Sequence, residues 1–217
     1  MVATVTENPK SLRERRAQLT RDEILSSARR LFAERGYSRT TVRDIADAAG
    51  VSAQTVYDSV GSKQELVARL NDLIDAEAGI VAIAVTAARS GDPREVAATS
   101  ARITRSILEN CGDIVRALVT GAAAEPDLRI PLEEGQRRHL EGAGQTVEHL
   151  RRMGSLDEAL RPEDAVASLA AISDVRFALL LQDGYGWSLD RVEQWIASTS
   201  RSLLLGSEAA PRRTTRR

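Results

Sequence analysis

Apolar positions with helical spacing dominate the first part of the chain. Between Thr20 and Gly36 they recur three or four residues apart, as side chains on one face of a helix do. Thr20 and Glu23 have the spacing of a capping box, in which both side chains satisfy amides at a helix start. The pattern predicts a first helix from Thr20 to Gly36. Its buried face consists of Ile24, Leu25, Ala28, Leu31 and Phe32.

Further helix starts with their own capping residues follow closely. They are the pair Thr41 and Asp44, the single residue Ser52, and the pair Ser62 and Glu65. Hydroxyl side chains at these positions accept hydrogen bonds from the first amides of a helix. They predict two short helices, which end at Gly50 and at about Ser59, and the start of a longer fourth helix.

Glycine and proline punctuate the rest of the chain and separate apolar stretches of helical period. These stretches predict helices over residues 62–88, 94–110, 112–125, 131–152, 162–182 and 188–206. Alanine and leucine are abundant and aromatic residues make up only 3% of the chain, a composition that favours helices over strands. The expected fold class is all-α, with about nine helices.

Charge is distributed unevenly and suggests a division into parts. Residues 1–70 carry a net charge of +3, residues 71–211 a net −8, and residues 212–217 a net +4. A basic head on an acidic body suits a protein that presents one end to a polyanion. We expect a flexible basic arm over 1–19, a DNA-binding domain over 20–66, an effector-binding and dimerisation domain over 67–206, and a disordered basic tail over 207–217.

Several function classes are disfavoured. No apolar run reaches the ~18 residues of a membrane span and the N-terminus lacks a signal-peptide core, so we expect no membrane partner and a cytoplasmic location. The single cysteine, Cys111, and the isolated His139 and His149 predict no metal site. No nucleophile, base and acid form a set, so neither an enzyme nor a cofactor is expected. A helical enzyme stays the rival from another class.

The two short helices and their connection have the pattern of a helix-turn-helix. The turn needs a small residue at the helix contact, a glycine in the left-handed conformation and an apolar plug, which Ala46, Gly50 and Val51 supply. The second helix then presents its N-terminal half to the major groove. There Gln54 can pair with adenine, and Ala53 can contact a thymine methyl group.

The run from Thr41 to Tyr57, followed by Gly61 to Leu66, resembles the TetR family of transcriptional regulators. The resemblance covers residues 20–70 and implies an all-helical DNA-binding regulator. It implies phosphate contacts from Thr41, Thr55, Tyr57 and Lys63 and base contacts from Ala53 and Gln54. The candidate DNA-binding residues are Thr40, Thr41, Arg43, Ser52, Ala53, Gln54, Thr55, Tyr57 and Lys63.

Asp58, Ser59 and Val60 depart from the family, which usually has basic or aromatic residues and then phenylalanine there. Asp58 lies where its carboxylate can repel DNA phosphates. Alternatively it is electrostatically silent because it caps or pairs locally, for example with Lys63. The recognition helix carries no positive charge, so affinity must depend on Lys63, Arg43 and the arm.

The C-terminal part also resembles the family, from Pro162 through Trp187 to Gly206. By that resemblance the last two helices form a four-helix interface between two copies of the chain. The operator is then a pseudo-palindrome of double-stranded DNA. A small-molecule effector that binds between the fourth and eighth helices releases the repressor from the operator. An activator, or a DNA-bound structural factor that acts without a ligand, stays an alternative.

Asp174 and Arg176 lie within the most apolar helix, where an unpaired charge would be costly. Either they pair, with each other or across a dimer, or one faces water, or Asp174 points into the effector cavity. Asp174 and Phe177 are the candidate ligand-binding residues.

Overall fold

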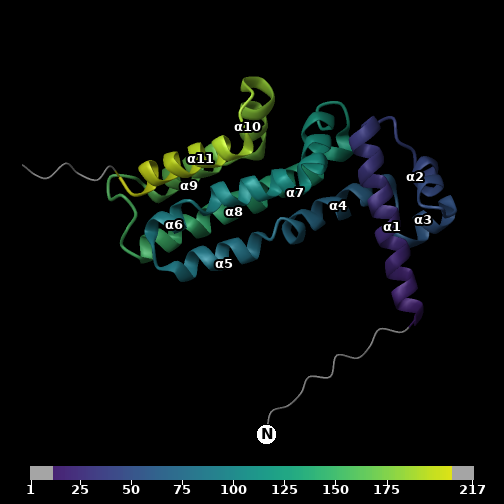
Figure 1. Ribbon diagram of the computed structural model, residues 1–217, viewed down its shortest axis with the longest axis horizontal. Helices are drawn as coiled ribbons and strands as arrows, with labels where there is room; N and C mark the ends of the chain where they lie inside the picture. The colour runs from purple at the N-terminus through teal and green to yellow at the C-terminus, as the bar shows by residue number, and fades with distance from the viewer. Residues whose placement is uncertain (1–11, 207–217) are drawn as a thin grey trace, which may run out of the picture. The chain divides into compact units, whose positions relative to one another are not determined.

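Helices account for the regular structure of residues 12–206, the part of the chain that the computed structural model describes (Figure 1). The chain divides into two compact units, residues 1–70 and 71–217. The first unit contains α1 (Leu12–Arg35), α2 (Val42–Ala48), α3 (Ala53–Ser59) and the start of α4 (Lys63–Glu77). The division lies inside α4, a few residues after the domain boundary that we expected at residue 66.

The second unit contains the end of α4 and all later helices. These are α5 (Ile80–Ser90), α6 (Pro93–Ala97), α7 (Thr99–Gly121), α8 (Arg129–Arg152), α9 (Pro162–Ile172), α10 (Val175–Leu179) and α11 (Leu189–Leu204). A 3₁₀ turn (Pro126–Leu128) precedes α8, and a π-helical turn (Leu180–Gly184) follows α10. When the five-residue helices α6 and α10 are set aside, nine longer helices remain over residues 12–206, and the all-α class is confirmed.

The first helix begins earlier than predicted. α1 starts at Leu12, and Thr20 lies inside it, where its hydroxyl donates to the Arg16 carbonyl at 3.0 Å. The predicted cap at Thr20 is therefore wrong, as is the flexible arm for residues 12–19. Arginine, glutamate, alanine and leucine, all strong helix formers, fill this stretch and extend the helix. The remaining arm residues 1–11 and the tail residues 207–217 lie outside the described part of the chain.

The other predicted caps are confirmed. The Thr41 and Asp44 side chains each bond the other residue's amide, at 3.1 and 2.7 Å. Ser52 accepts from the Thr55 amide at 3.0 Å. Ser62 and Glu65 form the reciprocal pair that opens α4, with bonds of 2.7 and 3.2 Å. Local side-chain chemistry thus fixes the starts of α2, α3 and α4.

Helix boundaries in the second unit differ from prediction at one glycine and agree with it beside another. The helix predicted over 62–88 ends at Glu77 and restarts at Ile80, because Gly79 takes the left-handed conformation with φ 60°. The break predicted between residues 110 and 112 coincides with a kink in α7, where the backbone of Cys111 is not helical (φ −132°, ψ 17°). The two helical segments that meet at this kink are continuous in hydrogen bonding, so α7 runs through Gly112 to Gly121. The buried face of α7 outweighs the ~1 kcal/mol helix penalty of one glycine, and it includes Leu108, Ile114, Val115 and Leu118.

The helix predicted over 162–182 is also divided. α9 ends at Ile172, and α10 begins at Val175 because the Asp174 carboxylate caps it, accepting from the Arg176 amide at 2.8 Å. The predicted helices over 131–152 and 188–206 are confirmed by α8 and α11, and Ser188 caps α11 as expected.

The core of the second unit joins α6, α8, α9 and α11. α8 packs against α9, and α11 packs against α7 and α9. A cluster of small and aliphatic residues fills the space between these helices, and its buried members are Val96, Ala97, Ala143, Val147, Leu150, Ala165, Leu169 and Leu204. Within residues 12–206, no helix is both long and apolar enough to cross a membrane.

Candidate functional site

The helix-turn-helix is built as the sequence predicts. Gly50 has the left-handed φ of 67°, and the Val51 amide then donates to the Ala46 carbonyl at 3.0 Å, which closes the turn between α2 and α3. Beneath it Ile45, Ala46 and Val56 are buried. The turn therefore holds α3 at a fixed place on α2, while the outer face of α3 is left exposed.

The candidate DNA-binding side chains on α3 are accessible. Gln54 is exposed and Tyr57 is 52% exposed, whereas Ala53 and Thr55 are half-buried. The Thr55 hydroxyl shares a 2.8 Å hydrogen bond with that of Ser52. The helix N-terminus and these side chains together form a surface that can face a DNA groove and its phosphates.

Asp58 pairs with a different residue from the one suggested by its sequence neighbourhood. Its carboxylate accepts a hydrogen bond of 2.8 Å from the Gln54 side-chain amide, one helical turn earlier. Lys63 instead lies with its ammonium nitrogen 3.7 Å from the ring centroid of Tyr37, a cation–π contact within the first unit. The local pairing that we considered for Asp58 thus exists, with Gln54 in place of Lys63.

The prediction that the Thr40 side chain contacts DNA is corrected by the structure. It is only 1% exposed, and its hydroxyl donates to the carbonyls of Leu31 and Gly36, at 3.3 and 2.9 Å. These bonds tie the end of α1 to the chain before α2, so the side chain is structural and cannot reach a phosphate. Thr41 and Arg43, by contrast, are exposed.

Acidic residues at the helix starts are held in their charged form. The Thr41 hydroxyl and amide hold the pKa of Asp44 below its ordinary value. The Ser62 amide and hydroxyl lower the pKa of Glu65 in the same way. Both carboxylates therefore stay ionised as caps at neutral pH.

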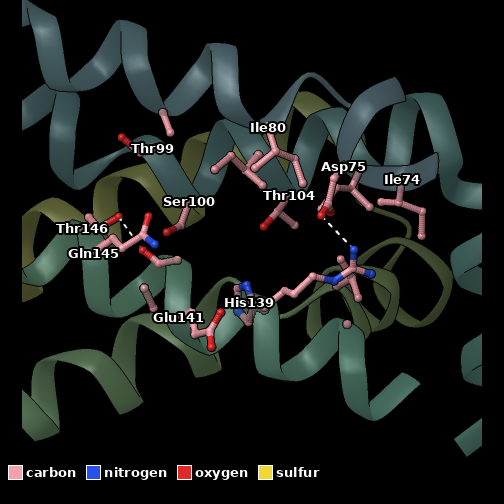
Figure 2. A pocket seen from close by; sticks show the side chains of 18 of the residues that line it. Ile74, Asp75, Ile80, Thr99, Ser100, Thr104, His139, Glu141, Gln145 and Thr146 are labelled. Atoms are coloured by element: carbon pink, nitrogen blue, oxygen red, sulfur yellow. Dashed lines mark hydrogen bonds and ion pairs between the residues drawn. The ribbon is translucent and has the colours of Figure 1, made fainter. Parts of the chain in front are cut away.

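The second unit contains a partly open cavity of about 650 Å³. Its walls come from the end of α4, from α5, α7 and α8, and from the chain at the start of α10, as Figure 2 shows from close by. We expected residues of 62–88 and 162–182 to line it, and both contribute, but α7 and α8 supply most of the wall. The larger apolar lining residues are Ile74, Ile80, Ile103, Ile107, Val115, Leu118 and Leu132.

Ion pairs are built into this wall. Arg138 on α8 bonds Asp75 on α4 at 2.8 Å, and Arg176 bonds Asp174 at 2.6 Å. Burial alone would raise the pKa of Asp174, but hydrogen bonds from the Arg176 side chain and amide bring it below its ordinary value. His139 also lines the cavity, with Nε2 2.9 Å from the Ala170 carbonyl oxygen.

Two of the alternatives for Asp174 are both observed, because its carboxylate pairs with Arg176 and the residue also lines the cavity. Phe177 is a correction. It is not among the lining residues, and its ring packs on Trp195 at a centroid distance of 5.5 Å, next to Trp187. The break before α10 turns Phe177 towards α11.

Sequence reasoning missed the polar residues of α7 that face the cavity, which are Thr99, Ser100 and Thr104. A signal was available, since hydroxyl residues at i, i+1 and i+5 interrupt the apolar stripe of an amphipathic helix. Without the rotation of that helix, the signal could not be assigned to a cavity.

Comparison with known proteins agrees with this geometry. Residues 24–70 match the family model of "Bacterial regulatory proteins, tetR family". The transcriptional regulator TcmR of Streptomyces glaucescens is 30% identical over 177 residues, 78% of this chain and 76% of TcmR. The repressor KstR2 of Mycolicibacterium smegmatis is 46% identical over 56 residues, 25% of this chain. That match spans only 27% of KstR2's own length.

A solved structure extends the likeness to the second unit. The SmeT–triclosan complex has a TM-score of 0.70 at 19% identity, over 88% of this chain and 94% of SmeT. A buried helix-turn-helix scaffold, an exposed outer face of α3 and an all-helical second unit are the architecture of a helix-turn-helix transcriptional regulator. The chain belongs to the TetR family of bacterial regulatory proteins.

Proposed function

We propose that the protein is a homodimeric repressor that binds a pseudo-palindromic operator through α3 and leaves it when a small molecule enters the cavity of the second unit. The observation that carries this proposal is the cavity of about 650 Å³, within the range of small-molecule sites. The bound triclosan named for SmeT, a structural relative, is consistent with a ligand role for this unit. The proposed effector is a small molecule, and we expect no cofactor. The proposed location is the cytoplasm, where operator DNA lies.

α4 provides a physical route from ligand to DNA. The helix begins beside α3 with the Ser62 cap and the buried Leu66, and its later residues Ile74 and Asp75 line the cavity. A ligand that moves this end of the helix biases the position of the other end. A coupling of about 1–3 kcal/mol changes DNA affinity roughly 5- to 150-fold.

The dimer is supported by the surface near the C-terminal helices. Leu180 and Tyr185, between α10 and α11, are 51% and 68% exposed. A second copy of the chain could cover these apolar side chains. A dimer would also supply two recognition helices, the number that operators with two half-sites require.

The test is a reporter gene whose promoter carries a binding site selected with the purified protein. The wild type should lower expression, and Gln54→Ala should restore it. Asn110→Ala, which removes an exposed side-chain amide on α7 that does not line the cavity, serves as the matched control and should repress like the wild type. Raised expression with the wild type would show an activator, and unchanged expression would contradict regulation from this site.

A further inference from the structure

Each charged side chain that lines the cavity has an oppositely charged neighbour, although the buried Nε of Arg138 has no hydrogen-bond partner among the described residues. Six charged side chains line the cavity, three acidic and three basic. Asp75 pairs with Arg138 and Asp174 with Arg176. Towards the exposed side, Glu141 pairs with Arg137, and Arg152 lies 3.6 Å from Glu148. A charged ligand would have to displace one of these partners or enter without a counter-charge, and either change is unfavourable in a partly buried site.

Most uncharged polar groups of the wall are also satisfied. The hydroxyls of Thr99, Thr104 and Thr146 donate to the carbonyls of Glu95, Ser173 and Gly142, at 3.3, 2.7 and 3.1 Å. The Asn71 amide donates to the Pro131 carbonyl at 3.1 Å. These groups stabilise the wall itself and are already engaged.

Ser100 on α7 is different. It is only 7% exposed and lines the cavity, and its hydroxyl has no hydrogen-bond partner among the described residues. In Figure 2 its side chain projects into the cavity, as does that of Gln145 from α8. Because the hydroxyl oxygen is accessible from the cavity, a ligand can supply its hydrogen-bond partner and gain specificity there.

The remaining wall is mainly aliphatic, because no phenylalanine, tyrosine or tryptophan lines the cavity and its only rings besides that of Pro131 are the imidazoles of His139 and His149. We propose that the effector is an uncharged, mainly aliphatic or alicyclic molecule with a hydroxyl or carbonyl oxygen that hydrogen bonds to Ser100. This proposal rests on the proposed function, since it names the class of molecule that would act at the same cavity.

Three probes that share the same ten-carbon chain but differ in the charge of the head group test the preference for an uncharged ligand. Decan-1-ol, decanoate and decyltrimethylammonium are titrated separately into the full-length protein by calorimetry without DNA, below their micelle concentrations. Decan-1-ol should bind at least about tenfold more tightly than either ion, because neither ion finds an unpaired counter-charge. If either ion binds as tightly as the alcohol, or if no probe binds, the proposal is overturned.

The role of Ser100 is tested with Ser100→Ala. Loss of one hydrogen bond should weaken decan-1-ol binding about fivefold. Thr120→Val, which removes an exposed hydroxyl on α7 outside the cavity, is the matched control and should bind like the wild type. Unchanged affinity in Ser100→Ala would overturn the assignment of Ser100. Because DNA is absent, a failure to bind an operator would overturn the proposed function without altering these titrations.

Discussion

The side-chain amide nitrogen of Gln54 lies 2.8 Å from a carboxylate oxygen of Asp58, one turn further along the exposed face of α3. Gln and Asp four residues apart are natural partners on a helix. The bond uses one amide hydrogen of Gln54 and leaves its oxygen and second hydrogen available. Adenine recognition in the major groove needs one such acceptor and one such donor. Asp58 thus orients the residue that we expect to read the operator.

Two substitutions of Asp58 separate its charge from its hydrogen bond. Asp58→Asn removes the charge but keeps an acceptor for Gln54, so affinity should rise roughly equally for operator and scrambled DNA. Asp58→Ala removes both, so affinity for scrambled DNA should rise while the preference for the operator falls. Fluorescence anisotropy with both DNAs at one salt concentration measures these changes. Equal operator preference in the two variants would mean that Asp58 acts through charge alone.

Gln54→Ala should lose about 1–3 kcal/mol of binding free energy on the operator and little on scrambled DNA, because only base recognition is removed. The same anisotropy assay applies, with Asn110→Ala as the control. Should Gln54→Ala weaken both DNAs to the same extent, Gln54 does not read bases, and the placement of α3 in the groove is wrong.

Salt dependence reports the phosphate contacts. A dimer that neutralises about six to eight phosphates should lose on the order of 10³-fold or more in affinity between about 50 and 200 mM salt. Lys63→Met removes the ammonium group, and with it the cation–π contact to Tyr37, and should reduce the salt slope by about two, one phosphate contact per protomer. An unchanged slope, measured by titration at several salt concentrations, would place Lys63 away from DNA.

The Asp174–Arg176 pair should make the free energy of unfolding depend on pH in the acidic range. Because the pKa of Asp174 in the folded protein lies below its ordinary value of 3.8, its contribution is present above that value and is lost as pH falls through the lowered pKa. Asp174→Asn should therefore flatten the fall in unfolding free energy between about pH 5 and pH 2, measured with urea. Asp72→Asn, an exposed substitution on α4, is the control; a wild-type acid profile in Asp174→Asn would exclude the pair as its source.

The sequence predicted those features that depend on neighbouring residues. The caps at Thr41, Ser52 and Ser62 and the turn at Gly50 are local, and all four form as expected. Features that depend on tertiary packing were missed. The break at Gly79 was not predicted, because the apolar pattern continues past it to residue 88, whereas the break predicted beside Gly112 coincides with the kink at Cys111.

The cavity shows the same limit more clearly. The side chain of Ser100 faces it because of the rotation of α7, and Phe177 turns away from it because α10 starts anew after Asp174. A pattern of apolar positions gives the buried face of a helix but does not distinguish a packed neighbour from a ligand space. Only the arrangement of α4, α5, α7 and α8 separates these two possibilities.

The most direct test of the central claim is selection of binding sites from random double-stranded DNA by the full-length protein at near-physiological salt, followed by sequencing. A dimer that reads DNA through two copies of α3 predicts an inverted repeat, with half-site centres separated by about one helical turn or a multiple of it. Gln54→Ala should lose a preference within each half-site. Enrichment of no motif, or of a single asymmetric half-site, would contradict a dimeric operator-binding regulator.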